Sequence, residues 1–99
     1  LGSEHLDTAA TRNNIGLVYK AQARFREALE MLKKSLVTKQ NVLGHEHPQV
    51  ASTLVNIANV YQAQGLYDEA LKTYEKSLKI DVKVHGPDHP LVADTKVHA

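Results

Sequence analysis

The pattern nearest to a metal site in this chain is the tripeptide His45-Glu46-His47. A zinc site needs three or four converging ligands, and two histidines share a helical face when they lie four residues apart. These two histidines are separated by one residue, and His5, His47 and His89 recur at intervals of 42 residues. A histidine that recurs just before a helix is explained by capping of the helix terminus. We therefore expect no metal and no other cofactor.

The other polar residues show no catalytic arrangement. Serines and threonines are present, but none lies in a nucleophile-elbow pattern or beside a glycine-rich phosphate loop. Cysteine is absent, which excludes disulfides and thiolate metal sites. We expect that the protein is not an enzyme.

Charge and hydropathy argue against nucleic-acid and membrane partners. Lysine and arginine number 12 against 11 aspartates and glutamates, so no basic surface is expected for phosphates or anionic lipids. The apolar runs are far shorter than the roughly 20 residues that cross a bilayer. The first residues also lack the basic start and apolar core of a signal peptide. The sequence thus predicts a cytoplasmic location, with no nucleic acid and no membrane as partner.

The elements that carry these residues repeat along the chain. A shift of 42 positions places Gly2 on Gly44 and Gly44 on Gly86, and about 18 of the 42 positions in the first two units are identical. Self-similarity at such a period is the signature of a repeat array. The predicted units cover residues 2–43 and 44–85, and residues 86–99 begin a third within one domain, 1–99.

Each unit predicts two helices. Apolar residues at spacings of three and four predict helices over residues 6–22, 25–43, 48–64 and 67–85, and Pro90 opens a fifth. No strand pattern occurs, so the expected fold class is all-α. The residues expected to face inward on the first helix are Ala9, Ile15, Gly16, Val18, Tyr19 and Ala21.

Glycine, proline and histidine mark the helix ends. Pro48 suits the first position of a helix, with His47 as its cap, and Gly44 suits a left-handed terminus after the preceding helix. Gly65 predicts the turn inside the second unit. The same place in the first unit holds Ala23, at a cost of roughly 1 kcal/mol if the turn needs a positive φ.

The second unit resembles the tetratricopeptide repeat (TPR) signature. The residues that carry the resemblance are Leu54, Ile57, Ala58, Tyr61, Gly65, Tyr67, Ala70, Tyr74 and Ser77. The usual period is about 34 residues, and the 42-residue unit is similar to the long repeats of kinesin light chains and nephrocystin-3-like proteins. The first unit departs at Arg12 and Ala23. The resemblance implies TPR-type antiparallel helix-turn-helix repeats that form a right-handed superhelical solenoid.

The resemblance also implies a protein–protein interaction scaffold. Its concave groove, lined by the first helix of each repeat, would bind a peptide or partner segment. The residues that the resemblance assigns to this groove are Ala10, Asn13, Leu17, Lys20, Ser52, Val55, Asn59 and Gln62. The alternative is an architectural, self-assembling segment of a larger array that has no peptide ligand of its own.

Asn14 and Asn56 coincide under the 42-residue shift and leave two interpretations open. Either amide could reach a bound peptide backbone, or it could be wedged between adjacent helices and hydrogen-bonded there, as a buried amide must be. We favour the second interpretation for both residues, and the groove for Asn13.

The two ends of the repeat array indicate how the chain could pack and associate. About three repeats are normally needed for stability, because each helix pair buries its apolar side against its neighbours. With two pairs and the start of a third, we expect the fifth helix to pack on the last pair. We also expect self-association through the exposed terminal faces, either end to end or by exchange of a helix.

Overall fold

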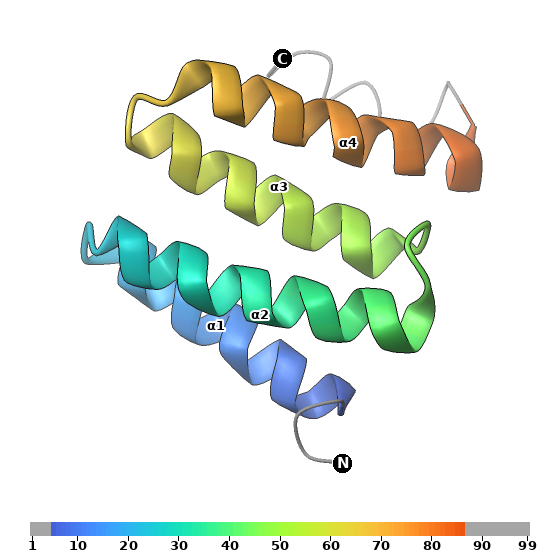
Figure 1. Ribbon diagram of the computed structural model, residues 1–99, viewed down its shortest axis with the longest axis horizontal. Coiled ribbons are helices and arrows are strands. Elements are labelled where there is room, and N and C mark those ends of the chain that lie inside the picture. The colour runs from blue at the N-terminus through green and yellow to red at the C-terminus, as the bar shows by residue number, and fades with distance from the viewer. Residues whose placement is uncertain (1–4, 87–99) are drawn as a thin grey trace.

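The computed structural model describes residues 5–86. Four helices follow one another along the chain: α1 (Leu6–Ala21), α2 (Phe25–Leu43), α3 (Pro48–Ala63) and α4 (Tyr67–His85). The helices form two antiparallel hairpins, α1–α2 and α3–α4, that stack so that α1 and α4 lie at opposite ends (Figure 1). Residues 5–86 contain no strand, and the predicted all-α class is confirmed. The helix predicted from Pro90 lies outside the described residues.

The two hairpins begin with the same histidine cap. The Nδ1 atom of His5 accepts a hydrogen bond from the backbone N–H of Asp7 at 3.0 Å, and His47 accepts one from Gln49 at 3.1 Å. Each bond satisfies an N–H group that has no partner inside its helix. Pro48 occupies the start of α3, where no N–H is needed. The predicted capping role of these histidines is confirmed.

The long helices α2 and α4 both end at a glycine with positive φ. Gly44 has φ 90° and ψ 162°, and Gly86 has φ 88° and ψ 166°. The positive φ expected at Gly44 is confirmed, but its ψ lies outside the left-handed helical region. This combination of angles is almost restricted to glycine, because a side chain would strain the backbone. These backbone angles end the helix at the glycine.

The turn within each hairpin also requires a positive φ. Gly65 supplies it in the second hairpin with φ 80°, and Ala23 adopts φ 62° in the first. Ala23 is the only non-glycine residue with positive φ between residues 5 and 86. Its Cβ makes the left-handed conformation unfavourable, so the strain predicted at this position is present.

Replacing Ala23 by glycine is expected to raise the free energy of unfolding by about 1 kcal/mol, because glycine adopts positive φ without the Cβ penalty. Chemical denaturation followed by circular dichroism measures the change. The reciprocal variant Gly65→Ala is the matched control. It should lose a similar amount, since a Cβ at Gly65 meets no atom within 4 Å and the effect is one of backbone alone. Equal stability of wild type and Ala23→Gly would contradict this prediction.

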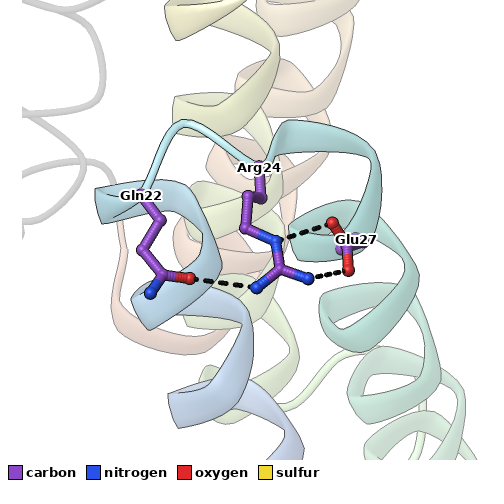
Figure 2. A network of polar contacts seen from close by, with 3 residues as sticks. All are labelled: Gln22, Arg24 and Glu27. Carbon is purple, nitrogen blue, oxygen red and sulfur yellow. Dashed lines mark hydrogen bonds and ion pairs between the residues drawn. The ribbon is translucent and has the colours of Figure 1, made fainter.

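Arg24 closes the first turn with contacts that the second turn lacks. Its guanidinium donates to both carboxylate oxygens of Glu27, with Nε at 2.8 Å from Oε1, and to Gln22 at 3.4 Å (Figure 2). The guanidinium also lies 4.5 Å from the centroid of the Tyr19 ring. The hydrogen bond with Glu27 raises the pKa of Arg24, and the same bond lowers the pKa of Glu27. The second turn has Leu66 in place of Arg24 and cannot form this network.

Within each hairpin, a small residue on the first helix allows the second helix to approach. Gly16 in α1 lies against Leu32 and the carbonyl of Ala28, and a Cβ at Gly16 would be 2.8 Å from Leu32 Cγ. The equivalent pair in the second hairpin is Ala58 and Tyr74, which lie in one buried cluster. Minimal side chains at the crossing point permit the close packing of the helices.

A buried serine forms the same hydrogen bond between the two helices of each hairpin. Ser35 in α2 donates to the backbone carbonyl of Ala9 at 2.8 Å, and Ser77 in α4 donates to that of Ala51 at 3.0 Å. Both the donor and the acceptor recur after 42 residues. The repeat seen in the sequence is therefore a repeat of specific hydrogen bonds as well as of apolar positions.

The two hairpins join where α2 packs on α3. Ala28 and Leu32 form one buried cluster with Ile57 and Val60. Beside this cluster, the ammonium group of Lys39 is buried and donates to the hydroxyl of Thr53 at 2.8 Å. Burial lowers the pKa of Lys39, since desolvation disfavours its charged form.

The inward stripe expected on α1 is partly wrong. Ala9 and Gly16 are buried and Tyr19 is half-buried, but Ile15, Val18 and Ala21 are exposed. Ile15 and Val18 are exposed, whereas their counterparts Ile57 and Val60 are buried beside α2. The helix α1 lies at the end of the stack and has no described helix before it (Figure 1). Ala21 is exposed in the last turn of its helix, as is its counterpart Ala63.

Candidate functional site

The sequence-predicted groove residues lie on α1 and α3, the first helices of the two hairpins. None of them is buried, so all present at least part of their surface to solvent. Those with exposed side chains are Ala10, Leu17, Ser52 and Gln62, and those with half-buried side chains are Asn13, Lys20, Val55 and Asn59. The two helices also touch each other directly. This polar and aliphatic face of α1 and α3, formed by these eight residues, is named the amide face below.

One amide pair joins α1 to α3 across the amide face. The Nδ2 group of Asn56 donates to the Oδ1 atom of Asn13 at 3.1 Å, and both side chains are half-buried. Asn56 thus bridges adjacent helices, as expected. Asn14, by contrast, is exposed, and no described helix precedes α1 to supply the partner that α1 supplies to Asn56. The expectation that Asn14 is wedged between helices was wrong.

A second polar group joins α3 to α4. The hydroxyl of Tyr74 bonds to the side-chain amides of Asn59 and Gln62, at 2.9 Å from Gln62 Oε1. The hydroxyl has one hydrogen to donate, so it donates to one amide oxygen while the other amide presents its NH₂ group to the hydroxyl oxygen. Burial raises the pKa of Tyr74 and keeps the phenol neutral at physiological pH. The contact holds both amides in fixed orientations at the edge of the amide face.

A small hollow adjoins this group at the start of α4. It has a volume of about 160 Å³ and is lined by Gln62, Tyr67, Ala70, Leu71 and Tyr74. Gln62 is therefore the member of the amide face that also borders an apolar recess. An aliphatic side chain could enter the hollow while its backbone meets the amide.

A larger cleft lies elsewhere, among α2, α3 and α4. Its volume is about 370 Å³, and its lining includes Leu54 and Ile57 together with Lys33 and Lys76. The ammonium of Lys33 lies 5.7 Å from the centroid of the Tyr61 ring. No residue assigned to the groove from the sequence lines this cleft, so it is a separate surface.

The described part of the chain offers no metal centre. Between residues 5 and 86, no three histidine, aspartate or glutamate side chains are placed to share an ion. In the same range, none of the helices combines the length and the apolar character needed to span a bilayer.

Comparison of the sequence with family models gives two matches. Two models of the tetratricopeptide repeat family match, one over residues 8–49 and the other over residues 49–97. The chain belongs to the tetratricopeptide repeat family. The TPR fold expected from the sequence is thereby confirmed, and the structure shows that the length of the 42-residue unit includes second helices of 19 residues against 16 in the first. TPR proteins generally mediate protein–protein interactions and act as non-enzymatic scaffolds.

A solved structure has the same fold. The crystal structure of BtubC (BKLC) from P. vanneervenii superposes with a TM-score of 0.89 at 24% sequence identity, over 96% of this TPR chain. The TPR chain spans 38% of the length of BtubC. A comparison with curated proteins finds no matching relative.

Sequence reasoning missed one pairing and one participant in the polar contacts of this TPR chain. Asn56 was recognised as an interhelical amide, but its partner was not identified as Asn13. Tyr74 was named only as a residue of the repeat signature, although a buried tyrosine hydroxyl usually finds a hydrogen-bond partner. That rule was the available signal, because Asn59 and Gln62 lie on the preceding helix of the same hairpin.

Proposed function

We propose that the amide face of this TPR chain binds an extended peptide segment of a partner protein. The observation that carries the proposal is the set of oriented amides on α1 and α3: Asn13 is held by Asn56, and Asn59 and Gln62 are held by Tyr74. An extended peptide exposes N–H and C=O groups at regular intervals, and amide side chains can pair with both. Because their partners already restrict them, these amides lose less conformational entropy on binding than free side chains would.

Apolar and charged residues complete the surface. Leu17 and Val55 lie on α1 and α3 and offer apolar contacts for alternate side chains of the peptide. Lys20 is the single charged residue of the amide face, and it favours a peptide with an acidic residue near the end of α1. The proposed partner is thus a mainly apolar segment with one acidic position.

The test uses a peptide selected from a random-sequence display library on the 99-residue chain. The variant Asn13→Ala is expected to weaken binding of that peptide about fivefold, as loss of one hydrogen bond does. The variant Asn14→Ala removes the neighbouring, exposed amide from the same helix and is the matched control, for which less than about a twofold change is expected. Fluorescence anisotropy of the labelled peptide gives both affinities.

NMR titration with the same peptide locates the bound surface. Shift changes confined to α1, α3 and the Tyr74 region would support the proposal. Shift changes centred on Lys33 and Lys76 would assign binding to the cleft among α2, α3 and α4 instead and would overturn it. Equal effects of the two asparagine variants would do the same.

A further inference from the structure

The cleft among α2, α3 and α4 lies between the two long helices of the chain. The helix α3 lies between α2 and α4 and contacts both, whereas the backbones of α2 and α4, which are described in full, are not in contact (Figure 1). The apolar residues that line the cleft are Leu36, Val37, Leu54, Ile57 and Tyr61. Leu54 and Ile57 are buried, and Val37 is 53% exposed. The cleft is therefore an apolar hollow that opens to solvent.

Two lysines line the cleft from opposite helices. Lys33 belongs to α2 and Lys76 belongs to α4. Neither ammonium group forms an ion pair with a carboxylate of residues 5–86. The ammonium of Lys33 instead lies near the Tyr61 ring, at a distance that allows a cation–π contact. Two positive charges thus border the apolar hollow without a negative partner in the described range.

The sequence explains why Lys76 has no carboxylate partner on its own helix. In α2 the equivalent lysine, Lys34, lies 3.9 Å from Glu30, which precedes it by one turn. The counterpart of Glu30 in α4 is Lys72, so Lys76 has a second cation at the place of a partner. The unpaired charge on this side of the cleft is therefore specific to the second unit and is not part of the repeat.

Two other lining residues also differ from their counterparts in the second unit. Glu75 occupies the position of Lys33, and Lys79 occupies that of Val37. All four side chains are exposed, so the fold accepts a lysine, a glutamate or a valine at these places. The packing of the repeat therefore does not require the cation and the exposed valine that the cleft contains.

The cleft does not depend on either end of the chain. A preceding unit would lie against α1, and no residue of α1 lines the cleft. A following helix that packed on α4 as α3 packs on α2 would cover Leu71, the counterpart of Leu29. Lys34, the counterpart of Lys76, is exposed although α3 is in place. Lys76 would therefore stay exposed beside a following unit.

We propose that this cleft binds an acidic segment of a partner protein, in which aliphatic side chains are flanked on both sides by carboxylates. The aliphatic side chains enter the hollow of about 370 Å³ and contact Leu36 and Tyr61. The carboxylates pair with Lys33 on α2 and Lys76 on α4. Burial of apolar surface supplies affinity, and the two lysines select against neutral and basic segments. The site is distinct from the amide face, with which it shares no residue.

A short synthetic peptide tests this chemistry. It has blocked ends and two leucines between two pairs of glutamates, and it is titrated into the ¹⁵N-labelled 99-residue chain. We expect shift changes around Val37, Tyr61 and Lys76, with a Kd of about 1 mM, at the weak end of the affinity scale. The affinity should fall as the NaCl concentration rises from about 50 to about 300 mM, because salt screens exposed charge pairs.

Charge-reversed variants test the two lysines. Lys33→Glu and Lys76→Glu are each expected to weaken binding of the peptide at least about fivefold, since each replaces an attraction by a repulsion. Lys34→Glu makes the same change of net charge on α2 but lies outside the cleft, and less than about a twofold change is expected for this matched control. A peptide with glutamines in place of the glutamates should bind the wild type at least about fivefold more weakly.

Val37 tests the apolar part of the cleft. Val37→Asp places a charge where the aliphatic side chains enter and is expected to abolish measurable binding. The exposed Val42, in the last turn of α2 and outside the cleft, provides the matched control Val42→Asp, which should bind as the wild type does. Asn13→Ala, on the amide face, should also leave the affinity unchanged. Circular dichroism verifies that each variant is folded.

Three results would overturn the proposal. The first is the absence of shift changes with up to about 5 mM peptide. The second is a set of shift changes centred on the amide face or on Leu71. The third is an affinity that the glutamine peptide, or either of the variants Lys33→Glu and Lys76→Glu, leaves unchanged.

Discussion

Replacing Leu32 by alanine is expected to lower the free energy of unfolding by about 3 kcal/mol, because the change removes apolar contacts and leaves a cavity. Leu32 is completely buried and is the largest of the fully buried side chains between residues 5 and 86. It contacts Gly16 within its own hairpin and joins Ile57 and Val60 in the cluster between the hairpins. A single substitution therefore weakens both the hairpin and the junction, and the loss should approach the upper part of the usual range.

Urea denaturation followed by circular dichroism at 222 nm measures this loss. The matched control is Leu66→Ala, since Leu66 is 46% exposed and its truncation should change stability by less than about 0.5 kcal/mol. A loss below about 1 kcal/mol for Leu32→Ala would show that the surrounding helices collapse into the space. That result would contradict the close packing described for this junction.

Replacing Gly16 by alanine is expected to destabilise the protein by about 2 kcal/mol, although glycine to alanine in a helix normally gains about 1 kcal/mol. The added Cβ would lie 2.8 Å from Leu32 Cγ and 3.2 Å from the carbonyl oxygen of Ala28. Leu32 is completely buried, and the carbonyl belongs to the helical backbone, so neither can move aside cheaply. The steric penalty should exceed the gain in helix propensity.

A double variant separates these two contributions. When Leu32 is already alanine, the nearest obstacle to the Cβ is gone, and Gly16→Ala should cost much less or become stabilising by up to about 1 kcal/mol. The double-mutant cycle then gives a coupling energy of about 2 kcal/mol between the two positions. Additive effects of the two substitutions would show that Leu32 is not the side chain that restricts position 16.

The helices and their ends could be predicted from the sequence because their signals are local. His47, Pro48 and Gly65 act on the backbone within one or two residues of their own positions, and the observed bounds differ from the predicted ones by at most one residue. The strained turn at Ala23 was predicted for the same reason, since the equivalent Gly65 shows what the turn requires.

Exposure and side-chain partners could not be predicted in this way. Ile15 and Ile57 are the same residue at the same place in the repeat, yet only Ile57 is buried, because burial depends on the helix that comes before. Asn14 and Asn56 differ for the same reason. The residues of the amide face were assigned from the resemblance to tetratricopeptide repeats, whereas the contacts of Tyr74 with Asn59 and Gln62 depend on how α3 and α4 cross.

Gly16 packs against Leu32 in the first hairpin, and Ala58 packs against Tyr74 in the second. Because the two pairs differ in size, each first helix fits the second helix of its own hairpin better than that of the other. If α2 took the place of α4 as the hairpin partner of α3, the branched Leu32 would meet the methyl group of Ala58, whereas even Gly16 leaves almost no room for Leu32. If α4 folded against α1, the phenol of Tyr74 would meet Leu17 and Lys20 in place of Asn59 and Gln62. Both mismatched hairpins are less stable than the native ones, so each first helix packs preferentially on the second helix of its own hairpin. Exchange of helices between two molecules is disfavoured for the same reason.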